Sequence, residues 1–88
     1  MIEREAKIVN PLGLHARPAA QLVRLASGFQ AEIEIVKDGT AVNGKSIMGV
    51  MMLAAECGSS VTVRADGPDE AQAVEALLTL VAGGFGES

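Results

Sequence analysis

The spacing of apolar residues changes repeatedly along this chain, and those changes limit the folds that it can adopt. Ile33 and Ile35 alternate with Glu32 and Glu34, a period of two that is typical of a β-strand with one buried face. Residues 19–26 follow the helical spacing instead, with apolar side chains three and four positions apart. Both periods recur farther along the chain, so helices and strands must be mixed within one short sequence.

These patterns predict elements in the order β-α-β-β-α-β-α. The expected strands cover residues 2–9, 31–37, 40–42 and 61–65, and the expected helices run from about 16 to 27, 47 to 55 and 70 to 82. Asp38-Gly39 is a two-residue hairpin signal between two of the strands. None of these elements can bury its apolar face alone. We therefore expect an α+β fold, an open-faced β-sandwich in which three helices cover one face of a four-stranded antiparallel sheet.

Residues with known capping preferences mark the expected helix ends. Ser46 is an expected N-cap of the second helix, Asp69 with Gln72 resembles a capping box for the third, and Gly28 is an expected C-terminal cap of the first. The apolar face of the third helix is predicted to comprise Ala71, Val74, Leu77, Leu78 and Val81. The glycine-rich tail after residue 82 is expected to be loosely held, except for Phe85, a candidate for docking on the sheet or third helix.

Length and composition indicate one domain, residues 1–88, with a single two-layer core. No apolar run approaches the roughly 20 residues of a membrane-spanning helix, and the first residues lack the apolar stretch of a signal peptide. The single cysteine, Cys57, excludes an internal disulfide and is expected to be a small buried residue near the end of the second helix. We expect a cytoplasmic protein without membrane insertion.

Charge and aromatic content exclude the common modes of nucleic-acid binding. The net charge is −4, and the chain has no Trp, no Tyr and only two Phe, so it lacks both a basic patch and a stacking platform. The first 24 residues carry a net charge of +2, whereas the last 24 contain five acidic side chains and no basic one. One histidine and one cysteine supply no zinc-ligand spacing, so neither a metal site nor a cofactor is expected.

The one histidine, His15, stands just before the first expected helix, and Arg17 follows two positions later. A helix N-terminus presents unpaired N–H groups and a partial positive charge, which suit a phosphate or carboxylate and favour a neutral, nucleophilic imidazole. Arg17 adds a charged donor for the oxygens of an anion. A phosphoryl group on His15 would meet both stabilisers. The alternative is a solvated loop histidine beside a surface charge.

Two longer motifs resemble those of a known family. Residues 13–19, Gly-Leu-His-Ala-Arg-Pro-Ala, resemble the active-site motif of HPr, the histidine-containing phosphocarrier family of the bacterial phosphotransferase system. Residues 43–51, Asn-Gly-Lys-Ser-Ile-Met-Gly-Val-Met, resemble that family's second motif, around its regulatory serine. The expected order of strands and helices agrees with the family over essentially the whole chain.

The resemblance implies a covalent phosphoryl carrier that works with partner enzymes and has no turnover of its own. In HPr proteins the histidine accepts a phosphoryl group from enzyme I, which obtains it from phosphoenolpyruvate, and passes it to a sugar-specific or regulatory acceptor of the enzyme IIA type. His15 occupies that position, with attachment expected at the δ nitrogen, and Arg17 occupies that of the phosphate-stabilising arginine. Such a transfer requires mainly positioning and charge stabilisation.

The second motif implies regulation and a partner surface. By resemblance, Ser46 is the target of HPr kinase/phosphorylase, and in some relatives the modified form binds a transcription regulator. The implied partner-binding residues are Ala20, Arg24 and Ser27 on the first helix and Ile47, Met48 and Met51 on the second. The alternative for the methionines is a core role, in which about half of that helix's apolar surface is inside, with Val50 and Leu53 as the core members. Arg24 could equally be a solvated charge.

Other functions stay open at this point. A purely regulatory module would use His15 or Ser46 as a signal without moving sugar, and the partner proteins that the cell encodes would separate the two. A generic α+β interaction domain would require both motifs to be coincidental. We expect a monomer, because a carrier docks on successive partners through one face.

Overall fold

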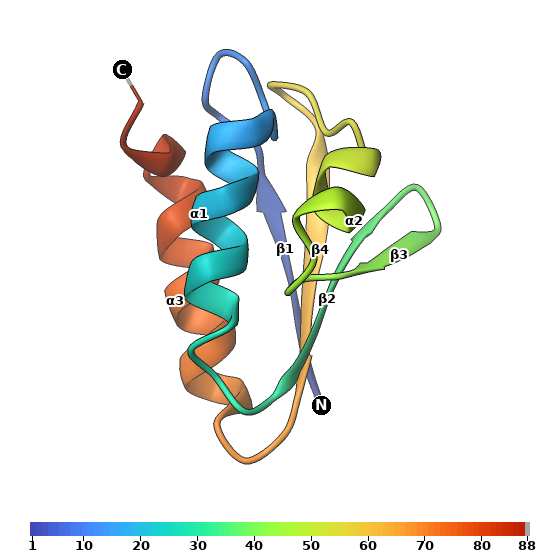
Figure 1. The fold of residues 1–88 in the computed structure, drawn as a ribbon, viewed down its shortest axis with the longest axis vertical. Helices are drawn as coiled ribbons and strands as arrows, with labels where there is room; N and C mark the ends of the chain where they lie inside the picture. Colours follow the sequence, from blue (N-terminus) through green and yellow to red (C-terminus); the bar gives the residue numbers. More distant parts are fainter. Residues whose placement is uncertain (88) are drawn as a thin grey trace.

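All the helices lie on one side of an antiparallel sheet (Figure 1). The computed structural model describes residues 1–87, and its elements are β1 (Ile2–Lys7), α1 (Ala16–Ala26), β2 (Glu32–Lys37), β3 (Thr40–Asn43), α2 (Ile47–Met52), β4 (Ser60–Asp66), α3 (Glu70–Ala82) and a 3-10 turn, η1 (Gly84–Gly86). The four strands lie in the order β1-β4-β2-β3, with every neighbouring pair antiparallel. The predicted α+β open-faced sandwich is confirmed.

The predicted hairpin joins β2 to β3. Lys37 pairs with Thr40, and Asp38 and Gly39 between them both have positive φ, 50° and 80°. These are the angles of a type I′ turn, whose twist matches that of the strands that it joins.

The core lies between the sheet and the helices. Alternate residues of the central strands β2 and β4 are buried against α1 and α3, as the sequence pattern predicts. They are Ile33, Ile35, Val61, Val63 and Ala65, and α1 contributes Ala19, Leu22, Val23 and Ala26. One residue of the predicted third-helix face is wrong: Ala71 is exposed, whereas Ala73 is fully buried. Alanine is small enough to lie on either face of a helix, so the sequence pattern did not show which of the two alanines is buried. The packing of α3 on the sheet decided it.

The opposite face of the sheet is open and polar. Arg64, on β4, donates from Nε to Glu3 Oε1 of β1 at 2.7 Å and from Nη1 to Glu34 Oε1 of β2 at 2.9 Å. Cross-strand pairs of opposite charge stabilise neighbouring strands without needing a covering layer. This face therefore needs no further helices.

The second helix is shorter than predicted. It ends at Met52, and Ala54 then turns the chain with a φ of +50°. This turn aims the carbonyl of Ala55 at the backbone N–H of Leu14, 2.8 Å away. Cys57 consequently lies beyond the helix and is exposed, so the expectation of a buried cysteine at the helix end is wrong.

The predicted capping box at Asp69 is also wrong. The Asp69 carboxylate makes no bond to its own helix and instead accepts hydrogen bonds from the backbone N–H groups of Gln30 and Ala31, both at 2.8 Å. These bonds stabilise the charged form and lower the pKa of Asp69. The side chain of Glu70 accepts the local bond, from Gly67 N at 3.1 Å. Asp69 therefore ties the start of α3 to the loop before β2.

The first helix ends without the expected glycine cap. Ser27 is its C-cap in the right-handed conformation, and its N–H approaches the carbonyls of Leu25 and Val23. Gly28 does not adopt the left-handed conformation that a glycine cap requires.

Candidate functional site

His15 is the N-cap residue of α1. Its backbone is extended, with φ −77° and ψ −173°, its carbonyl accepts the first helical bond from Ala19 N at 2.9 Å, and its side chain makes no capping bond. The imidazole is thus free to interact with other groups, beside the unpaired N–H groups of the first helical turn. Its side chain is 36% exposed, so a partner molecule can reach it.

A close contact between two loops fixes the backbone that leads to His15. Gly13 has a φ of +68°, and a Cβ there would overlap the carbonyl oxygen of Ala55 and lie 2.9 Å from the Cα of Glu56. On the other side of the loop, Asn10 Nδ2 donates to Gly13 O at 2.7 Å. A glycine is therefore needed at position 13 for both its conformation and its lack of a side chain.

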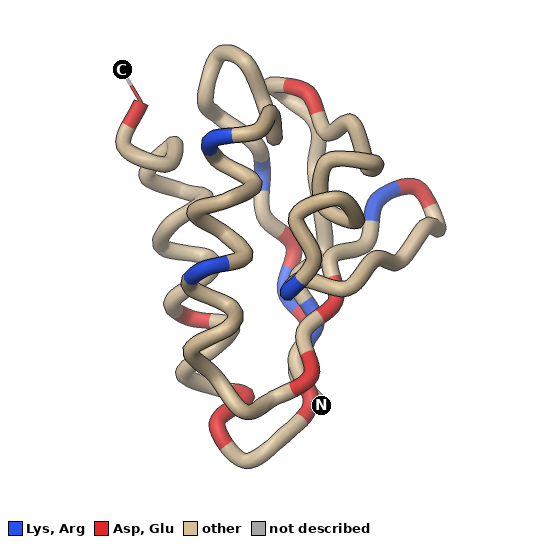
Figure 2. Tube along the Cα trace, viewed as in Figure 1, with Lys and Arg blue, Asp and Glu red and all other residues tan. Residues whose placement is uncertain are grey.

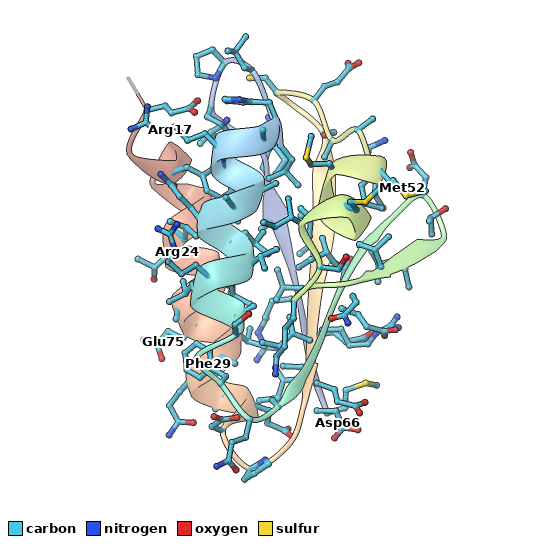
Figure 3. All side chains as sticks on the ribbon, in the orientation of Figure 1. Arg17, Arg24, Phe29, Met52, Asp66 and Glu75 are labelled. Carbon is cyan, nitrogen blue, oxygen red and sulfur yellow. The ribbon has the colours of Figure 1, made fainter. Side chains whose placement is uncertain are left out.

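Arg17 shares an open cavity with His15. The cavity has a volume of about 480 Å³ and is bordered by Leu12, Gln21 and the C-terminal residues Phe85 and Glu87 as well as by His15 and Arg17. Arg17 is exposed in the first turn of α1, close to the C-terminal segment (Figure 3). Arg17 and Arg24 are the two basic residues of α1 (Figure 2). The residues predicted to bind a phosphoryl group thus meet at one end of the molecule.

Glu87 also belongs to this site, although it was not among the residues that sequence reasoning placed there. Its Oε2 lies 2.9 Å from Nε2 of His15, and its Oε1 accepts from Asn10 Nδ2 at 3.2 Å. The expected docking of Phe85 is confirmed, because its ring lies in the core with 4% exposure. The expectation that the rest of the tail is loosely held is wrong as far as residue 87. Ser88 lies outside the described residues. Phe85 was the available signal, since a docked ring fixes where the next residues can go.

Ser46 caps α2 as predicted. Its Oγ accepts from Gly49 N at 3.2 Å, and its carbonyl accepts from Val50 N at 3.0 Å. The side chain is only partly buried, so the hydroxyl combines a structural role with access to solvent. Helices α1 and α2 lie side by side on the same face of the sheet (Figure 1).

The implied partner residues are mostly exposed. Ile47, Met48 and Met51 have exposed fractions of 44%, 74% and 42%, while Val50 and Leu53 are buried, as expected. Met52, which was a candidate for the core and not one of the implied partner residues, is 78% exposed and projects from α2 on the side away from α1 (Figure 3). The three methionines therefore form a surface rather than a core.

The residues implied on α1 differ in their surroundings. Ala20 is half-buried, and Arg24 and Ser27 are exposed. Arg24 lies on the side of α1 that faces α3 (Figure 3), next to a groove bordered by Leu25, Phe29 and Leu80. Its position on that side separates it from the methionine surface of α2.

Two negative findings concern residues 1–87. None of their helices is both long and apolar enough to cross a membrane. They also contain no group of three or more His, Cys, Asp or Glu side chains arranged to hold a metal ion.

Fold and site together define a class of small proteins, open-faced α+β sandwiches that expose a histidine at a helix N-terminus beside an arginine. Comparison with known proteins identifies the family. The model of the PTS HPr component phosphorylation site matches residues 2–83. The chain is 53% identical over 87 residues to the phosphocarrier protein HPr of Cupriavidus necator, covering 99% of this chain and 98% of the relative. The chain therefore belongs to the HPr family of phosphocarrier proteins.

Solved structures agree with this assignment. HPr-C-His from Thermoanaerobacter tengcongensis has a TM-score of 0.96 and 46% identity, covering 100% of this chain and 99% of the other. The catabolite repression protein Crh of Bacillus subtilis has a TM-score of 0.77 and 42% identity, covering 96% and 97%, and forms a swapped dimer. The likeness to Crh links the family to catabolite regulation. Because the Crh structure is a dimer, the expectation that this chain is a monomer stays a prediction.

Proposed function

We propose that this protein accepts a phosphoryl group on His15 from phospho-enzyme I and passes it to a sugar-specific or regulatory acceptor of the phosphotransferase system. The observation that carries the proposal is the position of His15 as N-cap of α1, in one cavity with Arg17. The protein acts as a covalent carrier, and the partner enzymes supply the rest of each active site. We place it in the cytoplasm, as a single domain.

The surroundings of His15 suit a phosphoryl group for two physical reasons. The N–H groups of the first turn of α1 and the helix dipole favour an anion at this end. The Arg17 guanidinium adds donors that match phosphate oxygens. Because Arg17 is exposed, its side chain can follow the phosphoryl group between the two partners.

The test is a mass measurement on the intact protein after incubation with enzyme I, phosphoenolpyruvate and magnesium. We expect one added phosphate on the wild type, lost in acid, and none on His15→Ala. Ser46→Ala is the control and should be modified as fully as the wild type. An acid-labile phosphate on His15→Ala would contradict the proposal.

We further propose that HPr kinase/phosphorylase modifies Ser46 and that this slows transfer to His15. A phosphate at the N-terminus of a helix is electrostatically favoured, so α2 should survive the modification. The new charge would lie beside the exposed side chains of Ile47, Met48 and Met51, and it should oppose docking of an acidic partner.

The charge effect can be tested with Ser46→Asp. One extra charge near an acidic surface costs about 1 kcal/mol, which corresponds to a transfer rate about fivefold lower. Ser60→Asp is a matched control. Ser60 is an exposed serine that pairs with Lys7 in the sheet, so the same charge is added on β4 and not on α2. If the two variants accept phosphate from enzyme I at equal rates, the regulatory proposal fails.

The partner-binding residues proposed here are Ala20, Arg24 and Ser27 of α1 and Ile47, Met48 and Met51 of α2, with Arg24 on the α3 side of α1 and the methionines on α2. They would serve enzyme I, the acceptor proteins and HPr kinase/phosphorylase in turn, and in the Ser46-phosphorylated form a transcription regulator. The flexible, polarisable methionine side chain suits a surface that meets several partners.

A purely regulatory role is the second candidate, favoured by the likeness to Crh. In that role a partner reads the phosphorylation state and no sugar moves. Transfer from the phosphorylated protein to a purified enzyme IIA-type acceptor separates the two functions, because a purely regulatory module would retain its phosphate.

A further inference from the structure

We propose that Glu87 is a positioning residue for His15, whose carboxylate holds the ring proton on Nε2 and thereby presents Nδ1 as the nucleophile. The contact that carries this inference is the distance of 2.9 Å between Glu87 Oε2 and His15 Nε2. The effect on phosphoryl transfer rests on the function proposed above, whereas the effect on the ring does not.

The tautomer follows from the chemistry of the two groups. An ionised carboxylate can only accept hydrogen bonds, so Nε2 of His15 must donate. A neutral imidazole carries one N–H, and when Nε2 holds it, Nδ1 keeps its lone pair. Without Glu87 both nitrogens would compete for the proton. The contact therefore selects which of the two ring nitrogens can attack phosphorus.

Glu87 is held in place from two directions. Asn10 Nδ2 donates to Glu87 Oε1 at 3.2 Å and to Gly13 O at 2.7 Å, and Asn10 itself is 1% exposed. Both N–H groups of the Asn10 amide are thus in use, which fixes its orientation. The carboxylate bridges this buried amide and the His15 ring.

The backbone of the tail provides the second restraint. Phe85 is buried with 4% exposure, and Glu87 N donates to Gly84 O at 3.0 Å, so the chain folds back on itself after α3. The Glu87 side chain is 23% exposed, less than the 36% of His15. A partly shielded hydrogen bond to a charged group is stronger than one in full contact with water.

The same contact bears on the transfer step. As Nδ1 attacks, its lone pair forms the new N–P bond, and the bond between phosphorus and the donor atom of phospho-enzyme I breaks, with its electron pair returning to the donor. The His15 ring then carries phosphorus on Nδ1 and a proton on Nε2, and is cationic. The Glu87 carboxylate faces that proton and balances the positive charge as it develops. In the onward step the charge disappears again.

The first measurement is the tautomer of His15 by long-range ¹H–¹⁵N correlation NMR at about pH 9, where imidazole is neutral. His15 is the only histidine in the chain, so its ring signals need no assignment by mutation. We expect the wild type to show a protonated Nε2 and an unprotonated Nδ1. In Glu87→Ala the two nitrogen shifts should move toward each other, as the tautomers mix.

Glu75→Ala is the matched control, because Glu75 is an exposed carboxylate on α3, well away from the His15 end of the molecule (Figure 3). It should leave the His15 shifts unchanged. Identical shifts in the wild type and Glu87→Ala would overturn the inference. This measurement uses no phosphoryl donor, so its outcome does not depend on whether the protein is a carrier.

The second measurement is the rate of phosphoryl acceptance from enzyme I by the same variants. A hydrogen bond to a charged group contributes enough for a loss of about tenfold in Glu87→Ala, at unchanged circular dichroism. Glu75→Ala should match the wild type. A tautomer change without any loss of rate would overturn the role in transfer. No transfer to the wild type would count against the proposed function instead.

Discussion

The close approach of two loops at Gly13 gives a quantitative test of how His15 is positioned. We predict that Gly13→Ala destabilises the protein by about 2–4 kcal/mol. Gly13 has a φ of +68°, and an added Cβ would overlap the carbonyl of Ala55. That carbonyl accepts the backbone N–H of Leu14 at 2.8 Å, and Leu14 is 4% exposed. Separating the loops would therefore leave a buried donor without a partner.

Two contributions make up this magnitude. An alanine in the left-handed region costs about 1–2 kcal/mol, which a stiffer unfolded chain offsets by about 0.4–1 kcal/mol. A buried, unsatisfied N–H adds about 1–3 kcal/mol. Gly39→Ala isolates the first contribution, because Gly39 has a φ of +80° with nothing within 4 Å of the added Cβ. It should cost only about 0.5–1 kcal/mol.

The assay is urea unfolding of the wild type and both variants, with free energies from the midpoint and slope of each transition. A thermal scan gives an independent value, since 1 kcal/mol shifts the melting temperature of a domain of this size by about 4–8 °C. Equal destabilisation by the two alanines would refute the reasoning, because strain alone would then explain both. The comparison also reports on function, since the displaced loop ends at the His15 N-cap.

Two further predictions concern the ends of α3. Phe85→Ala should lower the free energy of unfolding in urea by about 3–5 kcal/mol, since its ring is 4% exposed. It should also mix the tautomers of His15, because the tail would release Glu87. An unchanged His15 spectrum would mean that Phe85 does not place the tail. Asp69→Asn should be less stable than the wild type at pH 7, because the charged carboxylate accepts from Gln30 and Ala31 and its pKa is lowered. Because the pKa of Asp69 is lowered in the folded state, its contribution is complete above the unfolded value of about 3.9 and is lost as the pH falls through the folded value. The difference should therefore shrink as the pH falls below about 4. A difference that is constant with pH would exclude the charge as its cause.

Much of the fold could be predicted because its signals are local. The strand and helix periods identified the elements in their order, and the two-residue turn at Asp38-Gly39 fixed the hairpin. The N-cap role of Ser46 depends on an oxygen and an N–H only three residues apart, so its sequence context was sufficient. His15 was recognisable in the same way, because its place before a helix start can be read from its immediate neighbours.

The predictions that failed involve groups with more than one available partner. Asp69 was expected to cap its own helix. Its two carboxylate oxygens instead accept hydrogen bonds from two backbone N–H groups of the loop before β2. Ala71 and Ala73 were equally suitable for burial until α3 packed on the sheet. Cys57 became exposed because α2 ended early, where Ala54 turns the chain so that Ala55 meets Leu14.

The sequence by itself determined the order of the strands and helices, most of their apolar faces, and that a histidine and an arginine share a helix start. Only the tertiary structure decided that a carboxylate from the far end of the chain completes the site. Glu87 and His15 are 72 residues apart, and their contact depends on the docking of Phe85 and the buried amide of Asn10. Local patterns come from short-range backbone energetics, whereas such a contact exists only once separate elements have packed together.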